Sequence, residues 1–186
     1  MALMGCKDSD AYLQASLYAY KLEPSADAAV GCAAMAFKKG DIDGSVKFFD
    51  EAINLETDNA KKADNAYKAA SVLASAKKLS QARSYAQKAI SFNENFGAPY
   101  ILIAQLYAGN YKWNDEPALN KCTFFAAIDK LQRAKAVDPS VAEEANKLIS
   151  SYSAYTPEAK DLFMLGYKAG DRITIGGWIG ETTTIR

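Results

Sequence analysis

The sequence predicts an all-α protein of stacked antiparallel helix pairs that ends in a short β-hairpin. Three observations lead to this fold class. Apolar residues recur at the helical spacings i, i+3, i+4 and i+7 from residue 1 to about residue 154. Similar segments recur along the chain, which is typical of repeat architectures. Residues 171–186 then change to an Ile- and Thr-rich composition with central glycines.

Composition and charge limit the classes of function. The chain has 186 residues, 49% of them hydrophobic, which suits one globular domain with a sizeable core. Lys and Arg total 22 and Asp and Glu total 22, so no positive excess favours a nucleic acid or an anionic membrane as partner. The longest apolar run, 28–37, is interrupted by Gly31 and is far shorter than the roughly 20 residues of a membrane span. We expect neither a nucleic-acid partner nor a membrane span.

The sequence also argues against common catalytic chemistry. Histidine is absent, which removes Ser-His-Asp and Cys-His nucleophilic systems and the commonest metal ligand. The three cysteines, Cys6, Cys32 and Cys122, are widely spaced and form no C-x-x-C pair, so we expect them to be small buried apolar residues. The sequence therefore predicts a protein that is not an enzyme and has no metal or cofactor.

The N-terminal residues favour the interpretation that this chain is the C-terminal part of a longer protein. The first ten residues lack the basic and long apolar regions of a signal peptide, although residues 3–6 superficially resemble a lipoprotein cleavage box. The sequence runs from Cys6 directly into a helical pattern, as a fragment that begins inside a repeat would. We expect exposed apolar residues at this truncated end, which is a candidate surface for self-association: Leu3, Met4 and Leu17.

The helical segments are clearest where a broad apolar face is followed by a stop signal. Val46, Phe49 and Ile53 form an apolar stripe, and their neighbours widen it to the face of a helix packed on two others. Gly40 and Gly109 have the character of helix stops. These signals predict short helices joined by short turns.

Four segments with similar endings indicate an internal repeat. The alanines that begin these endings are Ala19, Ala52, Ala89 and Ala134, and they are spaced by 33, 37 and 45 residues. The endings themselves are AYKLEP, AINLET, AISFNE and AKAVDP. Such spacings are close to a period of about 34 residues and then increase, which indicates insertions in the later copies.

These features resemble the tetratricopeptide repeat (TPR), a pair of antiparallel helices with small residues where the helices cross. The segment 40–55, GDIDGSVKFFDEAINL, is the most specific match. Small residues also fall at the expected first-helix positions Ala33, Ala70 and Ala104. The resemblance covers roughly residues 2–154 and implies a right-handed helical solenoid.

The repeat spacing divides the chain into units. Pro24 and Pro139 match the proline that closes a TPR unit, whereas Thr57 and Glu94 depart from it. We predict the following divisions: a partial unit at 1–24, units at about 26–59, 63–96 and 97–140, an extra helix at 140–154, and a C-terminal helix with a β-hairpin cap at 155–186. The third unit contains an inserted loop at 109–120, which carries Tyr111 and Trp113.

The tail, DRITIGGWIGETTTIR, is the part least like a TPR. Alternation of Ile173 with Ile175 predicts two short strands in a hairpin. Trp178 and Ile179 at its turn either cover apolar surface near Leu162 and Phe163 as a cap, or stay exposed to a partner. The tail is similar to that of a bacterial group of TPR proteins with a GGWIGE-type ending. That resemblance implies the periplasm or cell envelope, while the residues themselves are equally compatible with the cytoplasm.

The resemblance to TPR proteins implies a concave groove lined by the first helix of each pair. TPRs that clamp an acidic chaperone terminus use Lys and Asn where this chain has Val30 and Ala34, so we do not expect that ligand class. Phe37, Tyr67 and Ile101 are equally compatible with ordinary packing between repeats. The predicted groove consists of Phe37, Lys38, Asp64, Tyr67, Ser71, Ile101 and Gln105, and further contacts are predicted for Tyr111, Trp113 and Trp178.

Three functional hypotheses remain open at this point. The first is a non-catalytic protein or peptide interaction module, a scaffold or adaptor with aromatic anchors in its groove. The second is a structural subunit of a bacterial envelope assembly. The third is glycan binding through Trp113 and the tyrosines.

Overall fold

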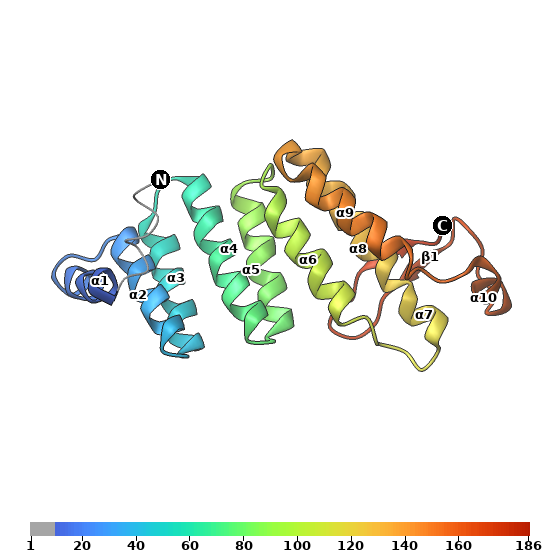
Figure 1. Ribbon diagram of the computed structural model, residues 1–186, viewed down its shortest axis with the longest axis horizontal. Coiled ribbons are helices and arrows are strands. Elements are labelled where there is room, and N and C mark those ends of the chain that lie inside the picture. Colours follow the sequence, from blue (N-terminus) through green and yellow to red (C-terminus); the bar gives the residue numbers. More distant parts are fainter. Residues whose placement is uncertain (1–9) are drawn as a thin grey trace. The chain divides into compact units, whose positions relative to one another are not determined.

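The computed structural model describes residues 10–186 (Figure 1), and these residues form two compact units. Unit 1 is described from residue 10 to Glu94, and unit 2 comprises Asn95–Arg186. Each unit has its own packed helices, and each is described by itself below.

Unit 1 is a series of helices joined by short turns. Each helix packs on the next one along the chain, as antiparallel neighbours do (Figure 1). The helices are α1 (Asp10–Leu22), α2 (Ala26–Lys38), α3 (Ile42–Leu55), α4 (Asn59–Ser75) and α5 (Leu79–Phe92).

Local sequence signals explain where these helices begin and end. Asp41 caps α3 by accepting from the backbone N–H of Gly44 at 2.9 Å. Asp58 caps α4 by accepting from Ala60 N–H at 2.7 Å. Gly40, predicted as a helix stop, follows α2 with φ +79°, a conformation that a Cβ would strain.

The core of unit 1 is built mainly from small side chains. One buried cluster joins Ala33 and Ala69 to Phe49 and Val72, and a second cluster contains Ile53, Ala66 and Ala89. Alanine at a crossing lets two helix backbones approach closely, and the adjacent large residue fills the remaining space.

Unit 2 contains longer connections and larger buried residues. Helix α8 packs against both α6 and α9. The buried side chains of these elements include Ile103, Tyr107 and Leu131. The elements are α6 (Gly97–Gly109), α7 (Pro117–Lys121), α8 (Thr123–Val137), the 3-10 helix η1 (Pro139–Val141), α9 (Ala142–Ser153) and α10 (Ala159–Met164).

The prediction of a loop at 109–120 is wrong in its last part, because α7 begins inside it. Glu116 caps this helix by accepting from Ala118 N–H at 3.3 Å, and Pro117 occupies its first turn. Proline is favoured at that position because its fixed φ suits a helix start. The Glu-Pro pair was thus a helix signal within a segment that repeat spacing marked only as an insertion.

The C-terminal hairpin forms as the sequence predicts. Strands β1 (Arg172–Thr174) and β2 (Thr182–Thr184) are antiparallel, with Ile173 opposite Thr183. Ile173 and Ile175 are both buried, as expected for alternating residues on one face.

The hairpin packs on α6 and α8, and it does not cover Phe163 of α10, one of the two predicted contacts. Phe163 stays 75% exposed, whereas Trp178 makes an edge-to-face contact with Tyr107 of α6, with ring centroids 5.7 Å apart. Tyr107 donates to Glu181 at 2.5 Å, and Thr183 donates to Asp129 of α8 at 2.6 Å. The tail therefore finds its apolar and polar partners on α6 and α8.

Two ion pairs complete this attachment of the tail. Lys130 of α8 pairs with Glu181, and Arg186 pairs with Asp129. Arg186 also lies over the ring of Phe125, at 5.8 Å from its centroid. The hairpin is thus an integral part of the packing of unit 2.

The chain has the predicted fold class, an all-α helical solenoid with a short C-terminal hairpin. Within residues 10–186, no helix is both long and apolar enough to cross a membrane. Leu3, Met4 and Cys6 lie outside the described residues, and Leu17 is half-buried. Self-association through the N-terminal end stays a prediction.

Candidate functional site

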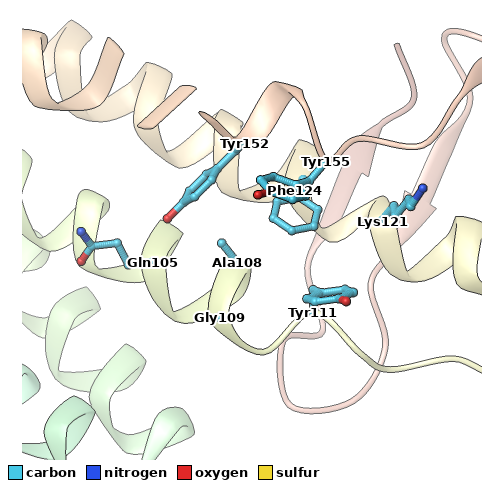
Figure 2. Close-up of a pocket in the computed structure, with 8 residues that line it drawn as sticks. All are labelled: Gln105, Ala108, Gly109, Tyr111, Lys121, Phe124, Tyr152 and Tyr155. Carbon is cyan, nitrogen blue, oxygen red and sulfur yellow. The ribbon is translucent and has the colours of Figure 1, made fainter. Parts of the chain in front are cut away.

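Unit 2 contains a cavity of about 460 Å³ whose walls are largely aromatic (Figure 2). This volume lies within the range of roughly 300–1,000 Å³ that is usual for ligand pockets. We call it the aromatic pocket, and it is lined by Gln105, Ala108, Gly109, Tyr111, Lys121, Phe124, Tyr152 and Tyr155.

The pocket forms where the ends of several helices meet. Ala108 and Gly109 belong to the last turn of α6, and they leave space because neither has a large side chain. Phe124 lies in the first turn of α8 and Tyr152 in the last turn of α9. Because α8 packs against both α6 and α9, these helix ends converge. Figure 2 shows the rings of Tyr111, Tyr152 and Tyr155 around Phe124.

The ring of Phe124 is the centre of the aromatic wall. Its centroid lies 5.4 Å from that of Tyr111 and 5.9 Å from that of Tyr152. Tyr155 stacks on it at 5.4 Å with an interplanar angle of 26°. Such arrangements stabilise aromatic groups beyond the burial of their area. Phe124 is buried while Tyr155 is 57% exposed, so the pocket is accessible on the side of Tyr155.

The pocket combines apolar walls with a few polar groups. Burial raises the pKa of Tyr152, so its hydroxyl stays neutral at physiological pH and can donate a hydrogen bond. Gln105 and Lys121 lie at opposite ends of the pocket in Figure 2. Lys121 supplies the one charge among the lining residues. This arrangement suits an apolar group with polar neighbours, while Lys121 also lies near Glu158 of the same chain and helps to lower the pKa of that carboxyl.

Unit 1 has a cleft of a different kind, with a volume of about 380 Å³. Its two lysines form ion pairs, Lys68 with Asp64 at 2.5 Å and Lys61 with Glu56 at 3.9 Å. Asn65 lines it and is only 5% exposed. We call it the charged cleft, and its lining residues are Asp27, Val30, Gly31, Ala34, Phe49, Glu56, Lys61, Asp64, Asn65 and Lys68.

Of the predicted groove residues in unit 1, the structure places Asp64 in the charged cleft. Tyr67 is half-buried and packs against the cluster around Ile53 and Ala89, as the packing alternative expected. Phe37 is 43% exposed near the end of α2. The remaining two do not line the cleft: Lys38 is exposed, and the Ser71 hydroxyl donates to the carbonyl of Tyr67 at 3.0 Å.

Of the predicted residues in unit 2, Gln105 and Tyr111 line the aromatic pocket, whereas Ile101 is buried in the core. Trp113 contacts the tail: a Cβ added at Gly176 would lie 2.7 Å from its ring. Trp178 packs on Tyr107. Both tryptophans are therefore engaged in attaching the tail.

Sequence reasoning missed most of the aromatic wall. Phe124 and Tyr152 come from two helices and Tyr155 from the turn after α9, and helical periodicity alone treats such residues as core. Tyr152 and Tyr155 are three residues apart, and the turn after α9, in which Tyr155 N–H donates to the Tyr152 carbonyl at 3.0 Å, keeps them close together. Their meeting with Tyr111, however, depends on how α8 and α9 pack.

Neither site has the donor set of a metal centre. In the part of the chain that the structure describes, no three or more Cys, Asp or Glu side chains gather closely enough to hold a metal ion. Cys32 and Cys122 are buried free thiols, and burial raises the pKa of Cys122 to about 11. The burial of both thiols and the raised pKa of Cys122 agree with the interpretation of these two cysteines as core residues.

Comparison with known proteins shows which type of fold this chain resembles. No family model matches the chain, and a search of curated proteins finds no match. Among solved structures, the crystal structure of MamA is similar with a TM-score of 0.54, at 15% sequence identity over 83% of this chain and 86% of that chain. At this identity the likeness concerns the fold, and it supports a TPR-type helical fold for this chain.

Proposed function

We propose that this chain is a non-catalytic protein-binding module that docks a peptide segment of a partner protein in its aromatic pocket. The observation that carries the proposal is the cavity of about 460 Å³, walled by Tyr111, Phe124, Tyr152 and Tyr155. Concave, mostly apolar sites with a few polar groups are typical of binding sites. Aromatic anchors also dominate the energy of many protein interfaces.

The lining residues define the chemistry of the ligand. An aromatic or large aliphatic side chain would fill the space above Ala108 and Gly109, and Tyr155 would cover it from the exposed side. Gln105 can donate to or accept from a peptide group at one end. Lys121 lies at the other end, within electrostatic range of Glu158 of the same chain. The chain has no histidine and the pocket lining has no carboxylate, so the titratable groups of the lining are Lys121 and three tyrosines.

Selection from a random peptide library tests the proposal directly. The whole chain is presented as target, and selected peptides are measured by calorimetry against the chain and against Ala108→Phe. This substitution fills the pocket from the partly exposed side of α6 and removes no existing contact. We expect binding to be weakened by roughly tenfold or more, as for the loss of a central anchor contact.

A matched control separates this effect from general damage. Ala74→Phe adds the same ring at a partly exposed position near the C-terminal end of α4 in unit 1, outside both sites. It should leave peptide affinity unchanged. If no peptide is enriched, or if Ala108→Phe binds the selected peptides like the unmodified chain, peptide docking at this pocket is wrong.

Glycan binding is the alternative that the same residues allow, because the exposed face of Tyr155 could stack on a sugar ring. Screening the chain on a glycan array decides between the two ligand classes. A location in the bacterial envelope, and a structural role there, are proposals that rest on the resemblance of the tail.

A further inference from the structure

The charged cleft of unit 1 has one carboxylate more than its lysines neutralise. Lys68 pairs with Asp64 at 2.5 Å. Lys61 pairs with Glu56 at 3.9 Å, so these four charges are matched within the cleft. Asp27 is the remaining charged residue of the lining, and it lies exposed in the first turn of α2. Among the described residues it has no ion pair and no side-chain hydrogen bond.

Asn65 lines the same cleft with hydrogen-bonding groups that the described part of the chain does not use. It lies in α4 and is only 5% exposed. Its carboxamide, which has one acceptor oxygen and two N–H donors, makes no hydrogen bond with a described residue. A buried polar group without a partner costs free energy. This cost is recovered if a polar ligand enters the cleft.

The rest of the lining is apolar and mostly small. It comes from α2 and α3 and consists of Val30, Gly31, Ala34 and Phe49. The volume of about 380 Å³ lies within the range of roughly 300–1,000 Å³ that is usual for ligand pockets. Long basic side chains bury their apolar stems along such surfaces and keep their charged ends at polar groups. The cleft therefore combines an apolar wall with an unmatched carboxylate and a free carboxamide.

We propose that the charged cleft is a second binding site, which takes an arginine side chain of a partner protein. The guanidinium N–H groups can donate to the carboxylate of Asp27 and to the carboxamide oxygen of Asn65, while the stem lies along Val30 and Ala34. Arginine suits two acceptors on different helices because its five donors form a planar fork, whereas a lysine has a single donor atom.

Other classes of side chain fit this lining less well. A carboxylate would add to the negative charge of Asp27, and an apolar side chain would leave the carboxamide of Asn65 buried without a partner. The inference goes beyond the proposed function, because the charged cleft is lined by residues of unit 1 and the aromatic pocket by residues of unit 2.

Matched peptides test the inference on the whole chain. The first probe is the capped peptide Gly-Ser-Arg-Ser-Gly, and the second has citrulline, which has the shape of arginine without its charge. NMR titration of the isotope-labelled chain measures dissociation constants up to about 10 mM, a range that covers contacts of one side chain. We expect the arginine peptide to bind about fivefold more tightly than the citrulline peptide, because a charged donor strengthens the hydrogen bonds.

Asp27→Asn removes the unmatched charge and changes the shape little. The arginine peptide should then bind no more tightly than the citrulline peptide. Glu144→Gln is the matched control, because it removes an exposed carboxylate without an ion pair from the first turn of α9, outside the cleft and the pocket. It should bind both peptides like the unmodified chain. An equal loss in both variants would mean that binding follows net charge and not the cleft.

Asn65→Leu separates binding from folding. The removed carboxamide has no partner among the described residues, so the midpoint of denaturant unfolding should stay the same or rise. The arginine peptide should nevertheless bind about fivefold more weakly, because a hydrogen bond to the guanidinium is lost. An asparagine with a purely structural role would show the reverse, a lower midpoint and unchanged affinity.

Four results would overturn the inference: no binding of the arginine peptide, equal affinity for the citrulline peptide, tighter binding of a glutamate peptide, or an Asn65→Leu variant with unchanged affinity. Ala108→Phe, which fills the aromatic pocket, should leave the affinity for the arginine peptide unchanged. If the library peptides bind at the aromatic pocket and the arginine peptide does not bind, only the site in the charged cleft is wrong.

Discussion

The two units build similar helix pairs from different side chains. The fully buried positions of unit 1 are mostly alanines, such as Ala33, Ala66 and Ala69, which are 0% exposed. Unit 2 buries large residues, including Tyr107 and Leu131. Alanine-based crossings fix close helix packing, and the cleft of unit 1 is lined mainly by polar and charged residues. In unit 2, aromatic side chains from α8, from α9 and from the segments that follow α6 and α9 gather around the small residues at the end of α6, and there the aromatic pocket forms.

The cleft of unit 1 and the pocket of unit 2 also differ in their charged residues. The charged cleft contains three carboxylates and two lysines, four of which are joined in two ion pairs. The aromatic pocket contains a single charge, and three of its eight lining residues are tyrosines. A cleft in which most charges already satisfy one another offers less to a ligand than an open apolar pocket does.

The largest expected effect is in the tail of unit 2. Ile179→Ala should lower the free energy of unfolding by about 3 kcal/mol, because this side chain is 1% exposed and its removal leaves a cavity. Denaturant unfolding followed by circular dichroism measures it. Thr182→Ala, at an exposed position of β2, is the control and should change stability little. Unchanged stability of Ile179→Ala together with lost ligand binding would make the tail a recognition element.

Overpacking should have the next largest effect, and it should be specific to the alanine crossings of unit 1. Ala69→Leu should cost about 2 kcal/mol, since a larger side chain at a fully buried position forces the packed helices apart. Ala60→Leu, at an exposed position of the same helix, should stay within about 0.5 kcal/mol. Thermal unfolding compares the two. Equal effects would mean that the crossing is not tightly packed.

A smaller effect is expected where α6 meets the tail. Tyr107→Phe removes the hydroxyl that donates to Glu181 at 2.5 Å and should cost about 1.5 kcal/mol, because the acceptor is charged. Tyr155→Phe changes the same group at an exposed position and should be neutral for stability. A neutral Tyr107→Phe would show that the ion pair of Lys130 with Glu181 is sufficient to hold the tail.

The smallest effect depends on pH and concerns the contact between α6 and η1. Hydrogen bonds from the Ser140 hydroxyl and from Gly97 N–H lower the pKa of Asp138 in the folded state. The carboxylate therefore contributes stability that is present above its unfolded pKa of about 3.9 and is lost as pH falls through the lower folded pKa. Asp138→Ala should cost about 1 kcal/mol at pH 7, the usual value of a cap.

Unfolding of Asp138→Ala and the unmodified chain is compared between pH 7 and about pH 2. The difference in stability should shrink below about pH 4, as the carboxylate of the unmodified chain becomes protonated. A difference that stays constant over this range would contradict the assignment. Asp43→Ala provides the control, because its carboxylate is largely exposed and makes only a surface ion pair with Lys78.

The sequence by itself determined the helical solenoid and the hairpin. Apolar spacing of the kind in Val46, Phe49 and Ile53 is local, and so are the stop at Gly40 and the alternation of Ile173 with Ile175. Local signals can be recognised without knowing what an element packs against, because they reflect helical and strand geometry. The start of α7 at Glu116 and Pro117 is also a local signal. It was missed because the repeat spacing marked this segment only as an insertion.

Only the tertiary structure decided where the tail docks and where the pocket forms. The tail prediction assumed the nearest apolar surface along the chain, near Leu162 and Phe163, whereas the tail's partners Tyr107 and Asp129 lie far from it in sequence. The aromatic pocket likewise joins α6, α8 and α9. Sequence periodicity identifies the face on which a side chain lies, but not which face of another element meets it. That pairing is fixed by the packing of the whole unit, through surface complementarity and the pairing of buried polar groups.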